Sequence, residues 1–223
     1  MTALTVNDVF YEYRNAYQTV KAVNGVSCQF EKGKVYAITG ASGSGKTTLL
    51  SLLAGLDLPT KGTIELDGVS TKKLRRNQYR LNHVSVIYQN YNLFYHLTVL
   101  ENAAYPLYIR HIPRRKANAI AKEMLLKVGL TEDQFRRMPN MLSGGEQQRV
   151  AIARTLVSGN EIVLADEPTG NLDSENSKNI VEILKQLAHE ENRCVIIVTH
   201  DPAVAEEADT VIRMKDGRLL ESA

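Results

Sequence analysis

Short apolar runs rich in Val, Ile and Tyr recur along the chain between polar stretches of helical length. Runs as apolar as Ile162-Val-Leu-Ala and Cys194-Val-Ile-Ile-Val indicate strands covered on both faces, as in a parallel sheet between layers of helices. The pattern therefore predicts an α/β fold with a mainly parallel sheet, whose clearest strands are Lys34–Thr39, Val84–Tyr88, Ile162–Asp166, Cys194–Thr199 and Asp209–Met214.

The two ends of the chain follow a different pattern. Leu4–Phe10 and Val23–Phe30 alternate between apolar and polar residues, with Asn24-Gly25 and Lys32-Gly33 as turn signals, which predicts an N-terminal antiparallel β layer. Near the C-terminus, Lys215-Asp-Gly217 separates Asp209–Met214 from Arg218–Glu221. An Asp-Gly turn between two such runs predicts a hairpin.

The middle of the chain, roughly residues 97–141, is helical instead. Four apolar residues at helical spacing follow Pro113, which suits the first turn of a helix: Ala117, Ile120, Met124 and Val128. Gly129 is expected to end this helix, and Thr131-Glu-Asp-Gln134 has the form of a capping box for a short helix after it. A helical lobe is therefore inserted between the second and third strands of the core.

Composition narrows the function without identifying it. The 223 residues are 43% hydrophobic and 23% charged, with a net charge of +2, which indicates a globular protein and gives no default reason to expect a nucleic-acid partner. No apolar run approaches the ~18 residues of a spanning helix, and the N-terminus lacks the pattern of a secretory signal. Cys28 and Cys194 both lie in apolar runs, which favours buried reduced thiols over a disulfide. The sequence predicts a soluble intracellular domain.

A glycine-rich loop carries the first chemical signal. Residues 40–48, Gly-Ala-Ser-Gly-Ser-Gly-Lys-Thr-Thr, follow the strand Lys34–Thr39 and precede a helical run, which is the context that a phosphate-binding loop requires. Its glycines let backbone N–H groups turn towards phosphate oxygens, and the helix N-terminus favours the same anion. Lys46 would contact the β- and γ-phosphates, and the Thr47 hydroxyl would bind Mg²⁺. We expect a nucleoside triphosphate site and a P-loop NTPase core.

Two carboxylates follow the strand Ile162–Asp166. Mg²⁺ held by one hydroxyl and by phosphates normally needs a carboxylate as well, and Asp166 is placed to supply it directly or through water. Glu167 leaves the strand one residue later and can face an attacking water as a general base. The alternative, a solvated Asp-Glu turn before Pro168, is less consistent with the neighbouring phosphate loop.

The segment Leu142-Ser-Gly-Gly-Glu-Gln-Gln-Arg149 has the form of a second anion-binding turn, with Ser143, Gly144 and Gly145 at the N-terminus of a helix. It resembles the signature loop of ABC-type ATPases, and the remaining motifs of that family occur in the same order over residues 4–221. Gln89 resembles the Q-loop residue, Gly170-Asn-Leu-Asp173 the D-loop and His200 the switch histidine. Tyr13 lies where the family places an aromatic residue that stacks on adenine.

The resemblance implies a RecA-like core and a head-to-tail homodimer with two ATP molecules between the subunits. Each ATP would contact one subunit's phosphate loop and its partner's Ser143 and Gly145. Water activation would fall to Glu167, contact with the γ-phosphate to His200, and Mg²⁺ binding and signalling to Gln89. The expected cofactors are ATP and Mg²⁺. The catalytic residues would be Lys46, Gln89, Glu167 and His200. The metal ligands would be Thr47, Gln89 and Asp166. The residues that contact the nucleotide would be Tyr13, Gly40, Ser42, Gly43, Ser44, Gly45, Lys46, Thr47, Thr48, Ser143, Gly144, Gly145 and Asp173.

The same resemblance implies one ATPase domain over residues 1–223. Its ATP-binding core would comprise residues 1–88 and 160–223, and its Q-loop, helical lobe and signature helix would comprise residues 89–159.

Some residue assignments stay open. Tyr11 and Tyr17 compete with Tyr13 for adenine, although Tyr13 has the spacing of the family. The basic run Lys72-Lys-Leu-Arg-Arg76 could approach acidic lipid headgroups, but a solvated helix face is the simpler interpretation. The other histidines, His83, His96, His111 and His189, lack metal-ligand spacing.

One cassette without a coiled-coil insertion suggests a separate membrane permease as the partner, with the ATPase peripheral on the cytoplasmic face of the membrane. The segments at 88–102 and 166–173 resemble the subgroup of lipoprotein-release, macrolide-export and antimicrobial-peptide-resistance ATPases. The alternative is a cell-division type of complex that signals to wall hydrolases. Tyr91, Leu93, Phe94 and Leu97 follow Gln89 closely, and would form either the core of the lobe or an apolar groove for a permease helix.

Overall fold

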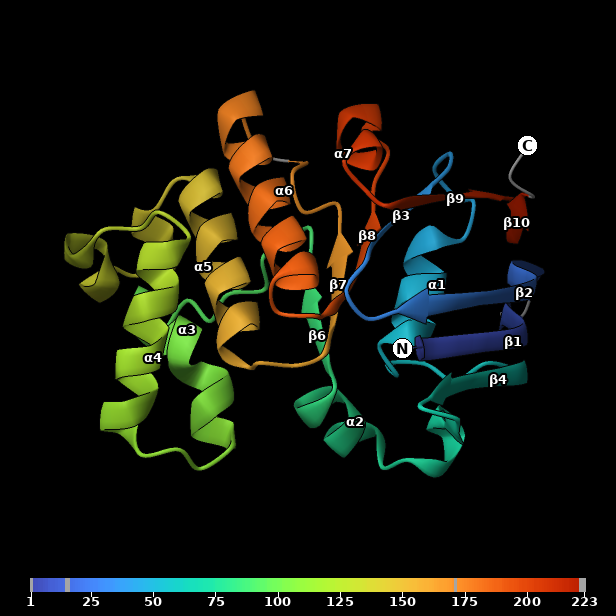
Figure 1. Ribbon diagram of the computed structural model, residues 1–223, viewed down its shortest axis with the longest axis horizontal. Coiled ribbons are helices and arrows are strands. Elements are labelled where there is room, and N and C mark those ends of the chain that lie inside the picture. Colours follow the sequence, from blue (N-terminus) through green and yellow to red (C-terminus); the bar gives the residue numbers. More distant parts are fainter. Residues whose placement is uncertain (1, 15–16, 171, 221–223) are drawn as a thin grey trace.

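The computed structural model describes residues 2–14, 17–170 and 172–220. Its central six-stranded sheet has the order β10-β9-β3-β8-β7-β6, and all neighbours pair in parallel except the β9–β10 hairpin (Figure 1). This confirms the predicted mainly parallel sheet, with every strand boundary within one residue of that predicted. The strands are β3 (Val35–Thr39), β6 (Val84–Ile87), β7 (Ile162–Asp166), β8 (Cys194–Val198), β9 (Thr210–Lys215) and β10 (Arg218–Leu220).

A second, antiparallel sheet has the order β2-β1-β4-β5, which confirms the N-terminal β layer. Its strands are β1 (Thr2–Arg14), β2 (Thr19–Glu31), β4 (Lys61–Leu66) and β5 (Val69–Ser70). The prediction of a turn at Asn24-Gly25 was wrong, because β2 continues through it. Gly25 has a φ of 72° and Asp8 on β1 a φ of 45°, and the pairing register shifts nearby, so the Asn-Gly signal marks a bulge.

The helical lobe lies between β6 and β7 in the chain and on the left of Figure 1. It contains α3 (Val99–Ile109), α4 (Arg114–Lys127), the 3-10 turns η2 (Glu132–Arg136) and η3 (Pro139–Met141), and α5 (Gly144–Val157). Pro113 is the N-cap of α4, not a first-turn residue as predicted. Gly129, with a φ of 80°, follows the end of α4, and the predicted box at Thr131 caps η2.

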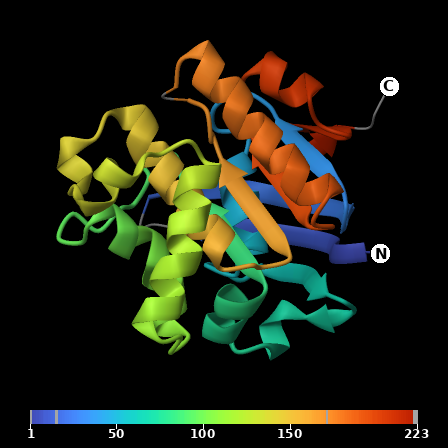
Figure 2. The same ribbon diagram turned by 60° about the vertical axis from the view of Figure 1, so that its left-hand side comes forward.

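The remaining helices cover the two faces of the central sheet. They are α1 (Lys46–Leu53), α2 (Arg76–Asn82, preceded by η1, Thr71–Lys73), α6 (Ser174–His189) and α7 (Pro202–Glu206). Along β7, Ile162 and Leu164 join the core with α1 and the antiparallel sheet, whereas Val163 and Ala165 join the core with α3–α6. In Figure 2 the orange helix α6 and the yellow and green helices of the lobe lie beside the orange strand β7. Burial on both faces explains the unbroken apolar runs.

Three smaller predictions can be compared with the structure. Cys28 and Cys194 are free thiols, and burial raises the pKa of each to about 12. The basic run at 72–76 is exposed, but it does not form one helix as predicted, because Leu74 and Arg75 are extended between η1 and α2. Within the described ranges, the chain has no helix with the length and apolarity needed to cross a membrane.

Candidate functional site

The phosphate loop connects β3 to α1. Lys46 is the first residue of α1, is 8% exposed, and donates from Nζ to the carbonyls of Gly40 at 2.8 Å and Ala41 at 3.0 Å. These bonds hold the ammonium group over the centre of the loop. An ammonium beside a helix N-terminus forms a site for a polyanion.

Backbone contacts from two other elements fix the shape of this loop. Gly45 has a φ of 101°, and a Cβ there would lie 2.1 Å from the Ala22 carbonyl oxygen on β2. A Cβ on Gly40 would lie 2.2 Å from the Met214 carbonyl oxygen on β9. The Gly217 N–H also donates to the Ser44 carbonyl at 3.0 Å. The loop is therefore braced by β2 and by the C-terminal hairpin, and glycine is required for both close approaches.

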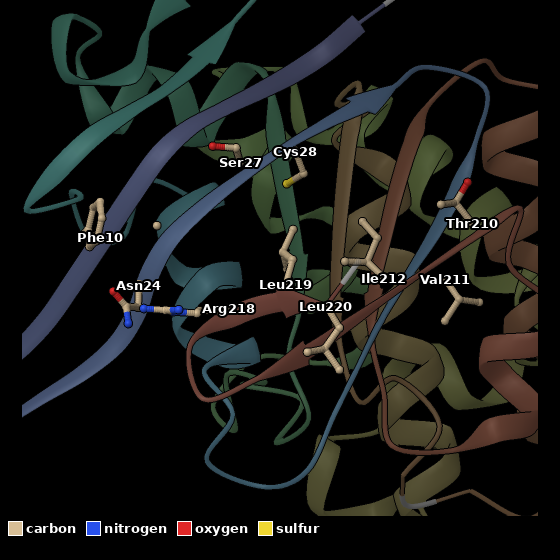
Figure 3. A pocket seen from close by; sticks show the side chains of 11 residues that line it. Phe10, Asn24, Ser27, Cys28, Thr210, Val211, Ile212, Arg218, Leu219 and Leu220 are labelled. Atoms are coloured by element: carbon tan, nitrogen blue, oxygen red, sulfur yellow. The ribbon is translucent and has the colours of Figure 1, made fainter. Parts of the chain in front are cut away.

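A crease lies between these two bracing elements (Figure 3). It has a volume of about 590 Å³, and its lining includes Phe10, Cys28, Arg218 and Leu219. None of the predicted site residues lines it. The raised pKa of Cys28 keeps that thiol protonated, so the crease offers no thiolate nucleophile.

Two oxygen groups meet at the carboxyl end of β7. The Thr47 hydroxyl donates to Asp166 Oδ1 at 3.4 Å. Burial, followed by the charge of Glu167, raises the pKa of Asp166. Gln89 lines the same pocket. Within the described ranges, no group of three His, Cys, Asp or Glu side chains could hold a metal ion alone. A hydroxyl, a carboxylate and an amide oxygen nevertheless suit Mg²⁺, which takes few protein ligands when substrate phosphates supply the others.

Glu167 lies directly after β7 in a left-handed conformation, with a φ of 48°. Its Oε1 lies 2.8 Å from Nδ1 of His200, which follows β8, and its Oε2 accepts weakly from the His200 N–H at 3.4 Å. The Glu167 side chain is 14% exposed and that of His200 is 72% exposed. The hydrogen bond to Glu167, together with its charge, raises the pKa of His200. A carboxylate and an imidazole thus meet at one end of the pocket.

These groups share one pocket of about 910 Å³. The predicted residues that line it are Tyr13, Gly40, Ser42, Gly43, Gly45, Lys46, Thr47, Thr48, Gln89, Asp166, Glu167 and His200. Ser44 is not in the lining; its side chain is buried at the base of the loop. Val20 and Asp216 also line the pocket. Sequence reasoning missed them because their positions follow from the β1–β2 register and from hairpin packing, which no local pattern indicates.

The three candidate tyrosines differ in exposure. Tyr13 is 49% exposed, lies 5.0 Å from the Tyr11 ring in an edge-to-face arrangement, and approaches the Thr48 hydroxyl at 3.4 Å. Tyr11 is packed against the core, and Tyr17 is 97% exposed. Of the three, only Tyr13 lines the pocket.

The predicted second anion-binding turn, Ser143–Gly145, lies outside the described lining of this pocket. Ser143 caps α5, accepting from the Glu146 N–H at 3.3 Å, while the Ser143 N–H donates to Glu146 Oε2 at 2.7 Å. Asp173 caps α6, accepting from the Asn176 N–H at 2.8 Å. Ser143, Gly144, Gly145 and Asp173 are absent from the described lining of the pocket, and Asn171 of the predicted D-loop lies outside the described residues. The predicted site residues therefore form two groups, one around the pocket and one at the N-termini of α5 and α6.

The side chains that follow Gln89 fall into a buried or half-buried group and an exposed group. Leu93 is buried in the lobe core, and Tyr91 and Leu97 are half-buried, whereas Phe94 is 43% and Tyr95 60% exposed. Arg154 of α5 donates to the carbonyls of Tyr91 and Asn92, each at 2.7 Å. Sequence reasoning missed Tyr95 and Arg154. A motif shows neither the exposure of the Tyr95 side chain nor the contact of Arg154 with residues about sixty positions earlier in the chain.

Comparison with known proteins identifies the family. The family profile described as "ABC transporter" matches residues 23–170. The chain belongs to the ABC transporter ATPase family. This cassette is 42% identical to the uncharacterized ABC transporter ATP-binding protein YclH of Bacillus subtilis over 97% of this chain and 95% of YclH. It is also 42% identical to the macrolide export protein MacB of Salmonella typhimurium, over 99% of this chain but only 34% of MacB.

Solved structures agree with this assignment. The bacterial ABC transporter cassette MJ0796, determined as a dimer, is 36% identical and superposes with a TM-score of 0.92 over 97% of this chain and 96% of that one. A second MJ0796 structure is a dimeric post-hydrolysis state bound to ADP and phosphate, with 35% identity and the same TM-score. The resemblance inferred from the motifs is confirmed. The ABC cassette is an ATP hydrolase.

Proposed function

We propose that this ABC ATPase is the motor of an export or extraction system, in which two copies hold ATP head-to-tail and act on a separate membrane permease. The relatives carry the first part of this proposal, since MacB is a macrolide export protein and this chain matches only its ATP-binding third. MacB supports a macrolide as the proposed substrate, and the resemblance of the segments at 88–102 and 166–173 adds an antimicrobial peptide or a lipoprotein.

The division of the site into two groups supports the dimer. One chain supplies a pocket with Lys46, Asp166 and Glu167, and, outside that pocket, the turn Ser143–Gly145, of which Ser143 and Gly144 are exposed. A second helix N-terminus that lies outside the described lining of this pocket is explained if it completes the pocket of another copy. We place Asp173 on the same contacting surface.

The roles within the pocket follow from the geometry. Tyr13 stacks on adenine, the loop at 40–48 binds the phosphates, and Thr47, Gln89 and Asp166 hold Mg²⁺, which neutralises phosphate charge when bound. Glu167 is the general base, and its 2.8 Å contact with His200 is exchanged when His200 turns to the γ-phosphate. This releases the carboxylate to accept a proton from water.

The permease contact is assigned to the exposed aromatic pair Phe94 and Tyr95. Phe94 is held rigidly: its N–H donates to Asn102 Oδ1 at 2.8 Å, and its ring lies 4.5 Å from that of Tyr105. Exposed aromatics on a fixed backbone are typical anchors for a partner helix, because little conformational freedom is lost on binding.

The test is co-purification with the candidate permease from the neighbouring reading frame. Tyr95→Asp is expected to abolish co-purification and permease-stimulated hydrolysis, while the isolated chain still binds ATP. Val211→Asp is the matched control, because Val211 is 40% exposed on the distant strand β9. A Tyr95→Asp variant that still binds the permease would overturn this assignment. Stimulated hydrolysis without export of any substrate would favour the signalling alternative.

A further inference from the structure

The charges of the chain are distributed unevenly. The chain has 27 Lys and Arg against 25 Asp and Glu, but ten of the basic residues and none of the acidic ones lie in residues 68–83 and 109–122. The rest of the chain is therefore net negative. Such an asymmetry produces a local positive potential that the overall charge of +2 does not reveal.

The fold brings the two basic segments together. Residues 68–83 contain α2, and residues 109–122 contain the turn from α3 into α4; both lie along the lower edge of the molecule in Figure 1. Arg110 joins them directly, because its guanidinium donates to the carbonyls of Leu81 and Ser158 and to Asn160 Oδ1. We define the basic edge as the exposed Lys and Arg side chains of residues 72–76 and 114–116.

These side chains are not held in ion pairs, although the charge of Arg114 contributes, after hydrogen bonds from Thr98, to lowering the pKa of Glu101. Elsewhere on the surface, lysines pair with carboxylates, as in Lys127–Glu191 and Lys185–Glu207. No ion pair among the described residues includes a Lys or Arg of the basic edge. Like charges gathered without paired carboxylates repel one another, so an anionic partner would be attracted to them.

Exposed aliphatic side chains accompany the charges. Ile109 is 49% exposed at the end of α3, and Val69 is 46% exposed beside η1. Leu56 is 38% exposed, and its carbonyl lies 3.5 Å from Arg76 Nη1. Basic residues mixed with exposed aliphatics suit the interface of an anionic bilayer, where the charges meet headgroups and the aliphatics enter the acyl boundary.

A nucleic acid is the less suitable polyanion. Binding of single strands depends on aromatic side chains that stack on bases. Tyr79 of α2 is 2% exposed, and Tyr108 lies under Arg114, whose guanidinium is 5.2 Å from the ring centroid. The described part of the edge therefore offers no free aromatic platform.

The position of the edge leaves the ATP site free. Helix α1 starts at the phosphate loop, and the Tyr79 hydroxyl of α2 donates to the carbonyl of Leu53, the last residue of α1, at 2.8 Å. The edge thus lies at the opposite end of α1 from the nucleotide. Contact there would not block the pocket or the Ser143–Gly145 turn.

We propose that the basic edge binds the anionic lipid headgroups of a membrane surface and holds the cassette against the bilayer independently of any permease. The inference goes beyond the proposed function, because it requires only the chain itself and acidic lipid. It also separates two causes of membrane association, a protein partner at Phe94–Tyr95 and the lipid surface at the basic edge.

The test is sedimentation of the purified 223-residue chain with vesicles of phosphatidylcholine alone, or of phosphatidylcholine mixed with phosphatidylglycerol. We expect binding only to the mixed vesicles, and a strong loss when salt is raised from about 0.1 M to about 0.5 M. Lys73→Gln/Arg75→Gln and Arg115→Gln/Lys116→Gln remove exposed charges that form no hydrogen bond among the described residues. Each double variant should lower the partition coefficient about 25-fold, at about fivefold per residue.

The matched control is Arg213→Gln/Lys215→Gln, which removes two exposed charges from β9, outside the edge. It should bind vesicles within about twofold of the unmodified chain. All variants should keep their melting temperature and basal ATP hydrolysis, which establishes that they are folded. Equal losses in the control and edge variants would overturn the proposal, as would binding that ignores phosphatidylglycerol. Tighter binding to a DNA duplex than to vesicles at equal phosphate concentration would also overturn it, in favour of a nucleic-acid surface.

Discussion

The phosphate loop and the Ser143–Gly145 turn are both glycine-rich N-termini of helices, yet their surroundings differ. The phosphate loop has a buried lysine, a carboxylate at the end of β7 and backbone braces from β2 and β9. The Ser143–Gly145 turn has an internal capping box, and Ser143 and Gly144 are exposed. One turn is built to hold an anion alone, and the other can only contribute to a site. The difference is what we would expect if a single chain carried both halves of a composite site without joining them, as we propose.

The largest expected effect is on ATP turnover, and it separates hydrolysis at the phosphate-loop pocket from ATP-dependent dimer formation. Glu167→Gln removes the proposed general base, so turnover should fall by ~10²–10⁴ while ATP binding is retained. Because hydrolysis would also release the two halves, the variant should elute as an ATP-dependent dimer in size-exclusion chromatography. Steady-state turnover near that of the unmodified chain would remove Glu167 from the mechanism.

A pair of glycine substitutions compares the two turns directly. Gly45→Ala places a Cβ against the Ala22 carbonyl in a left-handed backbone, and should cost about 2–5 kcal/mol of stability and abolish ATP binding. Gly144→Ala meets only the Tyr91 hydroxyl, at 3.2 Å, and should change stability by less than about 1 kcal/mol. Thermal unfolding and nucleotide titration measure both. Equal destabilisation would mean that the second turn is braced as the first is.

Stacking on adenine is expected to have an intermediate effect. Tyr13→Ala should weaken ATP binding by about 1–3 kcal/mol, since the ring lines the pocket and is exposed to a base. Tyr17→Ala is the control, because Tyr17 is exposed but does not line the described pocket. If nucleotide titrations showed the larger loss for Tyr17→Ala, the stack would be misplaced.

The smallest effect concerns protonation of His200. Glu167 raises the pKa of His200, so the Glu167–His200 pair stabilises the folded chain at pH values below the ordinary pKa of histidine. This contribution to stability is lost as the pH rises through the raised pKa of His200. An NMR titration of the ring should give a midpoint above 6.5 in the unmodified chain, and a lower midpoint in Glu167→Gln. An unchanged midpoint in the variant would show that Glu167 does not hold the imidazole in solution.

The sequence predicted most of the core because its strands are apolar on both faces, which leaves little ambiguity. It failed at Asn24-Gly25, where a bulge lets β2 continue. It also omitted β4, which has only two buried residues, Ile64 and Leu66, and pairs with distant β1. The pocket residues that follow strands were predictable, since the carboxyl ends of parallel strands meet at one edge. Tyr95, Val20 and Asp216 were not, because register and exposure arise from long-range packing.

The central claim is that each ATP site combines the phosphate loop of one chain with the Ser143–Gly145 turn of another. Mixing two inactive variants, Lys46→Ala and Gly145→Asp, tests it directly by ATP hydrolysis. In a head-to-tail dimer, each mixed pair contains one undamaged composite site, so the mixture should recover up to about a quarter of the activity of the unmodified chain. If each chain instead formed its own complete site, the mixture would be as inactive as either variant alone, and the composite site would be refuted.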